Sequence, residues 1–157
     1  MKKISGCTLL EMLITVALIS IVMAIAIPSM TTFNQNDRLT TNINTLIGHL
    51  AYARSEAVKR SQQVSICVSN DGATCTGGNN WEDGWIVYID ADGSNTFDAS
   101  EEVLRAQQAL TGNQTLTPTT FATQVIYDYR GFATSTGSFQ LCDNRTGPNG
   151  KTITISN

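Results

Sequence analysis

Residues 6–28 read GCTLLEMLITVALISIVMAIAIP, and this stretch decides the architecture of the chain. Apart from Glu11, residues 9–27 are almost entirely apolar, and these 19 residues would form about 28 Å of α-helix at ~1.5 Å per residue. That length is close to the roughly 30 Å hydrocarbon core of a bilayer. Because Lys2 and Lys3 precede the run, we expect the N-terminus to face the cytoplasm and the rest of the chain to face the other side.

Glu11 places a carboxylate just inside this predicted span, where a charge is costly and requires a partner. Two other kinds of N-terminal segment fit less well. A secretory signal peptide is cut after its apolar run, and residues 28–30, PSM, offer no convincing cleavage site. Residues 4–7, ISGC, look like the lipobox of a lipoprotein, but a lipobox follows its apolar region and this tetrapeptide precedes it.

The block GCTLLE at residues 6–11, followed by an apolar run that ends at Pro28, resembles the class III signal of type IV pilins and type II secretion pseudopilins. The resemblance implies that prepilin peptidase cuts after Gly6 and methylates the new N-terminus, Cys7, where the family usually has Phe. It implies that the apolar helix stays attached, holds the subunit in the bacterial inner membrane and later packs against other pilin or pseudopilin subunits. The new α-amine would then be the cation that pairs with Glu11 of a neighbouring subunit.

Beyond Pro28 the apolar residues recur at three- and four-residue steps, which predicts a half-buried helix that ends near Ser61. The residues on this predicted face are Leu39, Ile43, Leu46, Ile47, Leu50, Ala53, Ala57 and Val58. Pro28 lacks an N–H and clashes with the preceding turn, so we expect a kink or local unwinding near residues 23–28.

The remainder of the chain alternates short β-rich runs with turn clusters of Gly, Asn and Asp. The predicted strands are residues 63–68, 84–90, 102–106, 124–127, 138–142 and 151–156. Together with the helix they predict an α+β, type IV pilin-like fold, in which a long N-terminal helix packs on one or two antiparallel β-sheets. We divide the chain into a leader (1–6), a transmembrane and filament-core helix (7–28), an amphipathic half-helix (29–61) and a β-rich periplasmic domain (62–157).

Four further blocks resemble the GspH/FimT group of minor pilins and pseudopilins. They are ARSEAVKR at residues 53–60, VSIC at 64–67, WEDGWIVY at 81–88 and FQLC at 139–142. The resemblance implies a low-copy subunit that primes or caps a filament, and the sequence does not separate a type IV pilus from a type II secretion pseudopilus. Trp81 and Trp85 could form a surface patch for a partner, but a large aromatic residue beside a strand is more often buried, so we expect both in the core.

Three of the four cysteines lie in the predicted periplasmic domain, where a disulfide can persist. Cys67 and Cys75 flank a predicted turn at residues 70–72, and we favour a disulfide between them. Cys142 is then a free thiol, although three cysteines permit three single pairings and the alternatives stay open.

Residues 90–101 have the acidic spacing of a calcium-binding loop, with Asp90, Asp92, Asp98 and Glu101 as the candidate carboxylate ligands. Two features favour an ordinary hairpin turn instead. The glycine of the loop, Gly93, comes two positions early, and the flanking segments are predicted strands rather than helices. Calcium binding by this loop is therefore the less favoured prediction, and no other cofactor is expected.

The net charge of −3 excludes a general nucleic-acid-binding surface, so any DNA contact must be local. FimT-like relatives are implicated in DNA uptake through a basic C-terminal Gly-Arg-x-Arg motif, which is not seen here. Arg130, Arg145 and Lys151 are the basic candidates of the last third of the chain. DNA binding is therefore the second hypothesis for the function. An enzyme is not expected, because the chain has one His and no visible nucleophile–base constellation.

Overall fold

The computed structural model describes residues 8–120 and 123–156 of the chain. It divides into two compact units, residues 1–36 and 37–157, which are described separately. One helix, α1 (Leu9–Arg60), extends through both of them. The expected α+β fold with a long N-terminal helix and antiparallel sheets is confirmed.

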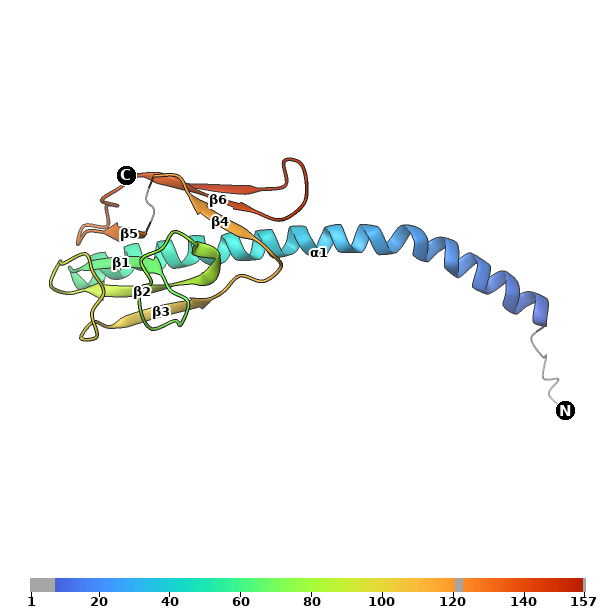
Figure 1. Cartoon of the computed structure of the whole chain (residues 1–157), viewed down its shortest axis with the longest axis horizontal. Coiled ribbons are helices and arrows are strands. Elements are labelled where there is room, and N and C mark those ends of the chain that lie inside the picture. The colour runs from blue at the N-terminus through green and yellow to red at the C-terminus, as the bar shows by residue number, and fades with distance from the viewer. Residues whose placement is uncertain (1–7, 121–122, 157) are drawn as a thin grey trace. The chain divides into compact units, whose positions relative to one another are not determined.

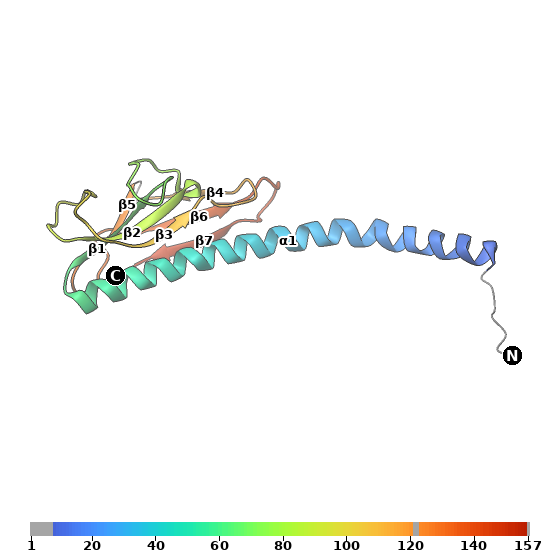
Figure 2. The same ribbon diagram turned by 90° about the horizontal axis from the view of Figure 1, so that it is seen from below.

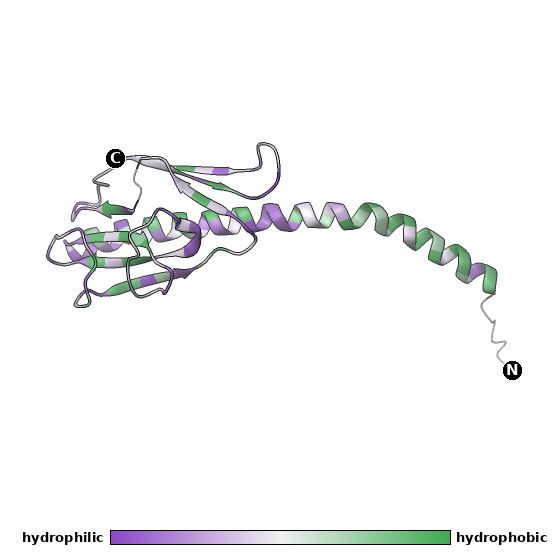
Figure 3. Cartoon of the chain, viewed as in Figure 1, coloured by the Kyte–Doolittle hydropathy of each residue, from purple (hydrophilic) through white to green (hydrophobic). Residues whose placement is uncertain are grey.

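The first unit consists of the N-terminal part of α1. Every residue from 8 to 34 is exposed, and Figure 3 shows apolar residues around this part of the helix. We expected a kink or local unwinding at Pro28, and of these two the local unwinding is absent, since the helix continues without interruption through this residue. Proline removes one intrahelical N–H, and the remaining backbone bonds suffice to continue the helix. The hydroxyl groups of Thr31 and Thr32 donate to the carbonyl oxygen of Pro28, over 2.9 and 3.3 Å.

In the second unit, α1 turns one apolar face toward the core, as predicted. Its buried residues are Leu39, Ile43, Leu46, Leu50, Ala53, Glu56 and Ala57. Ile47 and Val58 were also predicted on the buried face, but they are 43% and 52% exposed. Each directly follows a buried residue, Leu46 or Ala57, so its side chain lies further round the helix, at the border of the buried face.

The helix ends in a left-handed residue, Ser61, with φ 54°. The N–H of Ser61 donates to the carbonyl of Val58, and the N–H of Gln62 donates to the carbonyl of Ala57. This pair of bonds is a Schellman motif, which satisfies the last carbonyls of the helix and turns the chain into the first strand.

Within the described residues, seven strands form two antiparallel sheets (Figure 1). The four-stranded sheet has the order β3-β2-β1-β5, with β1 (Gln63–Val68), β2 (Gly84–Asp90), β3 (Val103–Gln108) and β5 (Gln124–Tyr127). The three-stranded sheet has the order β4-β6-β7, with β4 (Thr115–Pro118), β6 (Gly137–Cys142) and β7 (Lys151–Ile155). Six strands were predicted within two residues of these bounds, whereas β4 was not predicted.

A short 3-10 helix, η1 (Trp81–Asp83), links the two sheets. Trp81 is fully buried and meets Phe139 of β6 edge to face, with ring centroids 4.7 Å apart. Glu82 accepts the backbone N–H of Leu110 on its carbonyl and that of Leu116 on its carboxylate. The burial of Trp81 and Trp85 confirms the expectation that both tryptophans belong to the core.

Every residue of β2 is buried, because both faces of this strand are covered. Trp85, Val87 and Ile89 face the main core, which also contains the buried face of α1. Ile86 and Tyr88 face a smaller cluster with Cys67, to which Phe97 adds its ring. Figure 2 shows the same domain from below, with β7 running beside α1. The domain therefore has a well-filled interior, in contrast to the exposed N-terminal part of α1.

Candidate assembly helix and surface sites

The exposed N-terminal part of α1 is the most unusual surface of the chain. Residues 9–33 leave fifteen large hydrophobic side chains between 52% and 80% exposed. A soluble domain rarely leaves so large a continuous apolar surface uncovered. Among the described residues, α1 is the one helix whose length and composition would allow it to cross a membrane.

Glu11 lies in the first turn of this helix. Thr8 precedes the helix, and its hydroxyl oxygen accepts the backbone N–H of Glu11 over 3.3 Å. Thr8 thereby caps a backbone group that has no partner inside the helix. We did not predict this role from the sequence, although Thr-x-x-Glu before an apolar run is a known signature of a helix start. The start of the helix at Leu9 is therefore fixed by the cap at Thr8. Gly6 and Cys7, the predicted processing site, lie outside the described residues.

In the second unit, Cys67 and Cys75 form a disulfide, with their Cα atoms 5.7 Å apart. This is the pairing that the sequence favoured. Cys142 is free and lies on β6, in the other sheet. Asp71 orders the loop between the two bonded cysteines. Hydrogen bonds from the hydroxyl of Thr74 and from the N–H groups of Ala73 and Thr74 lower the pKa of Asp71 well below its usual range.

The acidic loop between β2 and β3 brings three of the four predicted calcium ligands together. Carboxylate oxygens of Asp90, Asp92 and Glu101 all lie within 4.8 Å of one another. Asp98 is not part of this group, because its carboxylate accepts the N–H and the hydroxyl of Ser100. Burial raises the pKa of Glu101, and the charge of Asp90 raises it further.

These carboxylates already have hydrogen-bond donors within the loop. Asp90 is 2% exposed and accepts the N–H groups of Ser94 and Asn95, over 3.0 and 2.9 Å. The carboxylate of Glu101 accepts the N–H of Ala91 over 3.2 Å and that of Asp98 over 3.1 Å. The cluster can therefore order a hairpin loop by itself.

The three basic residues proposed for DNA contact do not form an unpaired cationic patch. Arg130 pairs with Asp128 over 2.8 Å, and Arg145 pairs with Asp143 over 2.7 Å. The side chain of Arg145 is only 17% exposed. Lys151 is exposed at the start of β7. Because two of the three cations are matched by a neighbouring aspartate, little positive charge is left to attract phosphate groups.

The comparisons with known proteins agree with this description. Residues 42–157 match the family described as type II transport protein GspH, and residues 1–27 match the prokaryotic N-terminal methylation motif. No curated protein matches the chain.

Two crystal forms of the type IV minor pilin FimU from Pseudomonas aeruginosa have a similar fold. The first is 21% identical, with a TM-score of 0.63, and the match covers 79% of this chain and 86% of that chain. The second is 22% identical, with a TM-score of 0.59, and covers 75% and 86%. At this identity the likeness shows the fold alone, whereas the family match covers most of the chain. The chain therefore belongs to the GspH family of pilin-like proteins and carries the prokaryotic N-terminal methylation motif.

Proposed function

We propose that this protein is a minor subunit of a type IV pilus or of a type II secretion pseudopilus. The single observation that supports this function best is the uncovered apolar surface of α1 at residues 9–33. Such a surface is stable in lipid or against other apolar helices, and a filament core of bundled helices supplies the second environment after the membrane has supplied the first.

In this proposal prepilin peptidase cuts the chain after Gly6 and the new N-terminus, Cys7, is methylated. The subunit stays in the inner membrane, with residues 62–157 in the periplasm, until it is assembled. Glu11 then pairs with the α-amine of Cys7 in a neighbouring subunit. A carboxylate buried among apolar helices without a cation would be strongly unfavourable, so this pairing would fix the register of adjacent subunits.

The exposed domain would give the subunit its specific place in the filament. This domain consists of two antiparallel sheets and a disulfide-bonded loop, and the family match covers all of its strands. A DNA-uptake role is the second candidate that we considered. The pairing of Arg130 with Asp128 and of Arg145 with Asp143 argues against it.

Co-expression of the full chain with a prepilin peptidase, followed by mass spectrometry of the mature N-terminus, tests the processing step. We expect a mature chain that begins at Cys7. A chain that begins at any other residue would contradict the proposal.

Exchange of Glu11 tests the assembly step. Glu11→Gln should leave cleavage intact and reduce incorporation into filaments, because the neutral amide no longer attracts the α-amine. Asp37→Asn is the matched control, since Asp37 is an exposed carboxylate of the same helix outside the apolar run. Deletion strains then separate the two kinds of filament: loss of surface pili indicates a pilus subunit, and loss of protein secretion indicates a pseudopilus subunit.

A further inference from the structure

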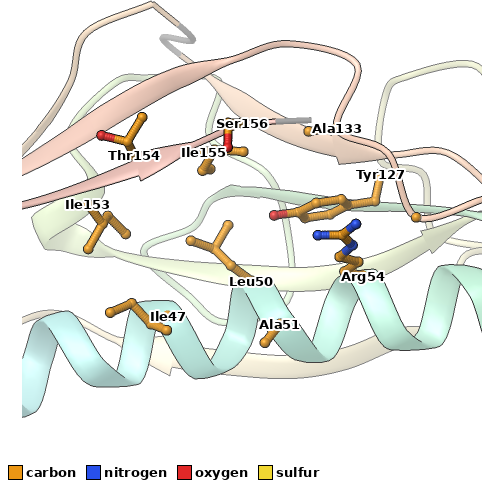
Figure 4. A pocket seen from close by; sticks show the side chains of 11 residues that line it. Ile47, Leu50, Ala51, Arg54, Tyr127, Ala133, Ile153, Thr154, Ile155 and Ser156 are labelled. Carbon is orange, nitrogen blue, oxygen red and sulfur yellow. The ribbon is translucent and has the colours of Figure 1, made fainter.

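A groove opens in the second unit between α1 and the last strand (Figure 4). Its volume is about 330 Å³, and residues 47–54 of α1 and 153–156 at the end of the chain form its two long sides. Ile47 and Ile153 lie at one end, Leu50 lies near the middle, and Arg54 and Tyr127 lie at the other end (Figure 4). The groove is thus aliphatic at one end and polar at the other.

One wall of the groove is an open sheet edge. β7 is the last strand of the order β4-β6-β7, and its outer side pairs with no strand in the part of the chain that the structure describes. The facing strand, β5, is already covered, because the N–H of Thr134 donates to the carbonyl of Ile126 over 2.9 Å and Tyr127 forms a bridge with Ala133. An open edge presents backbone donors and acceptors that an extended peptide can pair with.

The polar end of the groove holds two donors that have no acceptor among the described residues. Tyr127 is 6% exposed, and no hydrogen bond is made by its phenol within residues 8–120 and 123–156. Arg54 likewise has no carboxylate within ion-pair distance in these ranges, which also holds for Arg38 and Arg105. Arg54 is exposed and Tyr127 lines the groove, so both can donate to a group that enters it, and the guanidinium favours one that carries negative charge.

We propose that this groove binds an extended segment of a neighbouring filament subunit, which adds to β7 as a strand and places a carboxylate on Arg54 and Tyr127. This inference rests on the proposed function, because assembly in a filament is what places another subunit beside the domain. The open backbone edge selects a peptide over a lipid or a nucleic acid, since neither of these can complete a β-ladder.

The geometry also limits the sequence of the bound segment. Ile47 and Arg54 are seven residues apart on α1, which is about 10 Å at ~1.5 Å per residue. A strand covers that distance in about three residues, and side chains on one face alternate with a period of two. The segment should therefore carry an aliphatic residue and an Asp or Glu two or four positions apart, so that both side chains enter the groove.

Site-specific photo-crosslinking in cells that contain the complete assembly system tests the proposal. p-Benzoylphenylalanine is placed at position 51, which lines the groove, or at position 55, which is exposed one turn further along α1 and does not line it. We expect a crosslink from position 51 to a pilin-family subunit, in a peptide with the spacing given above, and none to that peptide from position 55.

Two substitutions provide a second readout. Ala51→Trp fills the groove, and Arg54→Glu repels the carboxylate; each should lower incorporation into filaments about tenfold, the effect of losing one charge-assisted contact. Ser55→Trp is the control and should incorporate normally. Thermal unfolding of all three variants separates a docking defect from a folding defect.

The outcomes distinguish the two proposals. A wild-type chain that is neither cut after Gly6 nor incorporated overturns the proposed function, and the inferred partner with it. A chain that is cut and incorporated, but gives no crosslink to another subunit from position 51 or tolerates Ala51→Trp, overturns the groove proposal alone. Loss of single-stranded DNA binding in Arg54→Glu with normal incorporation would assign the groove to nucleic acid and would also overturn it.

Discussion

The indole N–H of Trp85 donates to Nδ1 of His49 over 2.9 Å, and this bond ties β2 to α1. Trp85 is fully buried, so without His49 its N–H would lack an acceptor. Nδ1 accepts a hydrogen bond only when it carries no proton, which requires the neutral imidazole with its proton on Nε2. The pair therefore couples the packing of the helix on the sheet to the charge of one histidine.

We predict that this pair makes the stability of the domain sensitive to mild acid. Burial lowers the pKa of His49, and the charge of Arg105 lowers it further. Because the unfolded chain binds the proton at higher pH than the folded chain, the stabilisation is complete above about pH 6.5 and is lost as the pH falls below that value. Thermal unfolding of a 37–157 fragment from about pH 7 to about pH 5.5 measures the effect.

His49→Gln is the matched variant, since the amide oxygen of glutamine can accept the indole N–H but does not titrate. We expect its melting temperature to fall less over this pH interval than that of the wild type. Equal slopes in the two proteins would show that protonation of His49 does not destabilise the fold.

The disulfide should stabilise the domain against unfolding, whereas the third cysteine of the domain should contribute little to its stability. Cys67 and Cys75 are separated by 8 positions, and closing so short a loop is worth about 2.5 kcal/mol in the unfolded-chain entropy estimate. Urea unfolding of Cys67→Ser should therefore show a loss of about this size, and reductant should reproduce it in the wild type.

Cys142→Ser is the control for this prediction, because Cys142 is free and partly exposed. It should unfold close to the wild type and should abolish labelling of the oxidised 37–157 fragment by a maleimide. If labelling instead persists in Cys142→Ser, one of the other two cysteines is free in solution and the disulfide assignment is wrong.

The helix and most strands could be predicted because their signals are local. The apolar run at residues 9–27 and the three- and four-residue period that follows it define α1, and alternating or fully apolar runs define β1, β2 and β5. At Pro28 we predicted a kink or local unwinding, and the helix does not unwind there, because the backbone bonds on either side of the one that proline removes are kept.

The strand β4 was missed for a physical reason. Its sequence, TLTP, has one apolar residue, Leu116, and ends in a proline, which weakens any strand prediction. It forms because Leu116 is buried and because β6 supplies the backbone partners from a distant part of the chain. An edge strand of this kind depends on tertiary contacts that a sequence window does not contain.

The candidate sites also differ in whether their residues are close together in the sequence. The acidic spacing in residues 90–101 and the Cys67–Cys75 spacing could be read from the sequence, because their members lie within one loop. The groove could not be predicted from the sequence, because the residues of α1 and β7 that line it are about a hundred positions apart. The partners of Arg130 and Arg145 are two residues away, but only the structure shows that these aspartates bind them.

A glycine at the start of β2 should be irreplaceable. Gly84 has φ 113°, and a Cβ at this position would overlap the carbonyl oxygen of Gln107 and lie 2.8 Å from that of Ser69. Gly84→Ala should therefore destabilise the domain by about 3 kcal/mol or more, from backbone strain and overlap together. Chemical unfolding measures the loss.

Gly93 provides the matched control, because it also has a positive φ, 71°, but nothing lies within 4 Å of a Cβ built there. Gly93→Ala should cost only about 1 kcal/mol, the effect of the left-handed backbone alone. Similar losses at the two positions would mean that the overlap at Gly84 is relieved by a small shift of β3.

The loop between β2 and β3 should keep its fold without a cation. The carboxylates of Asp90 and Glu101 each accept two backbone N–H groups from within the loop, so most of the donors that a metal would replace are already present. We therefore expect the melting temperature of the 37–157 fragment to be the same in EDTA and in ~5 mM calcium, a concentration that would saturate even a weak extracellular site. A calcium-dependent rise would contradict this expectation. If Asp92→Asn with Glu101→Gln then removed the rise, these carboxylates would be metal ligands, since the exchange keeps their size and hydrogen-bonding oxygens and removes only the charge that attracts the ion.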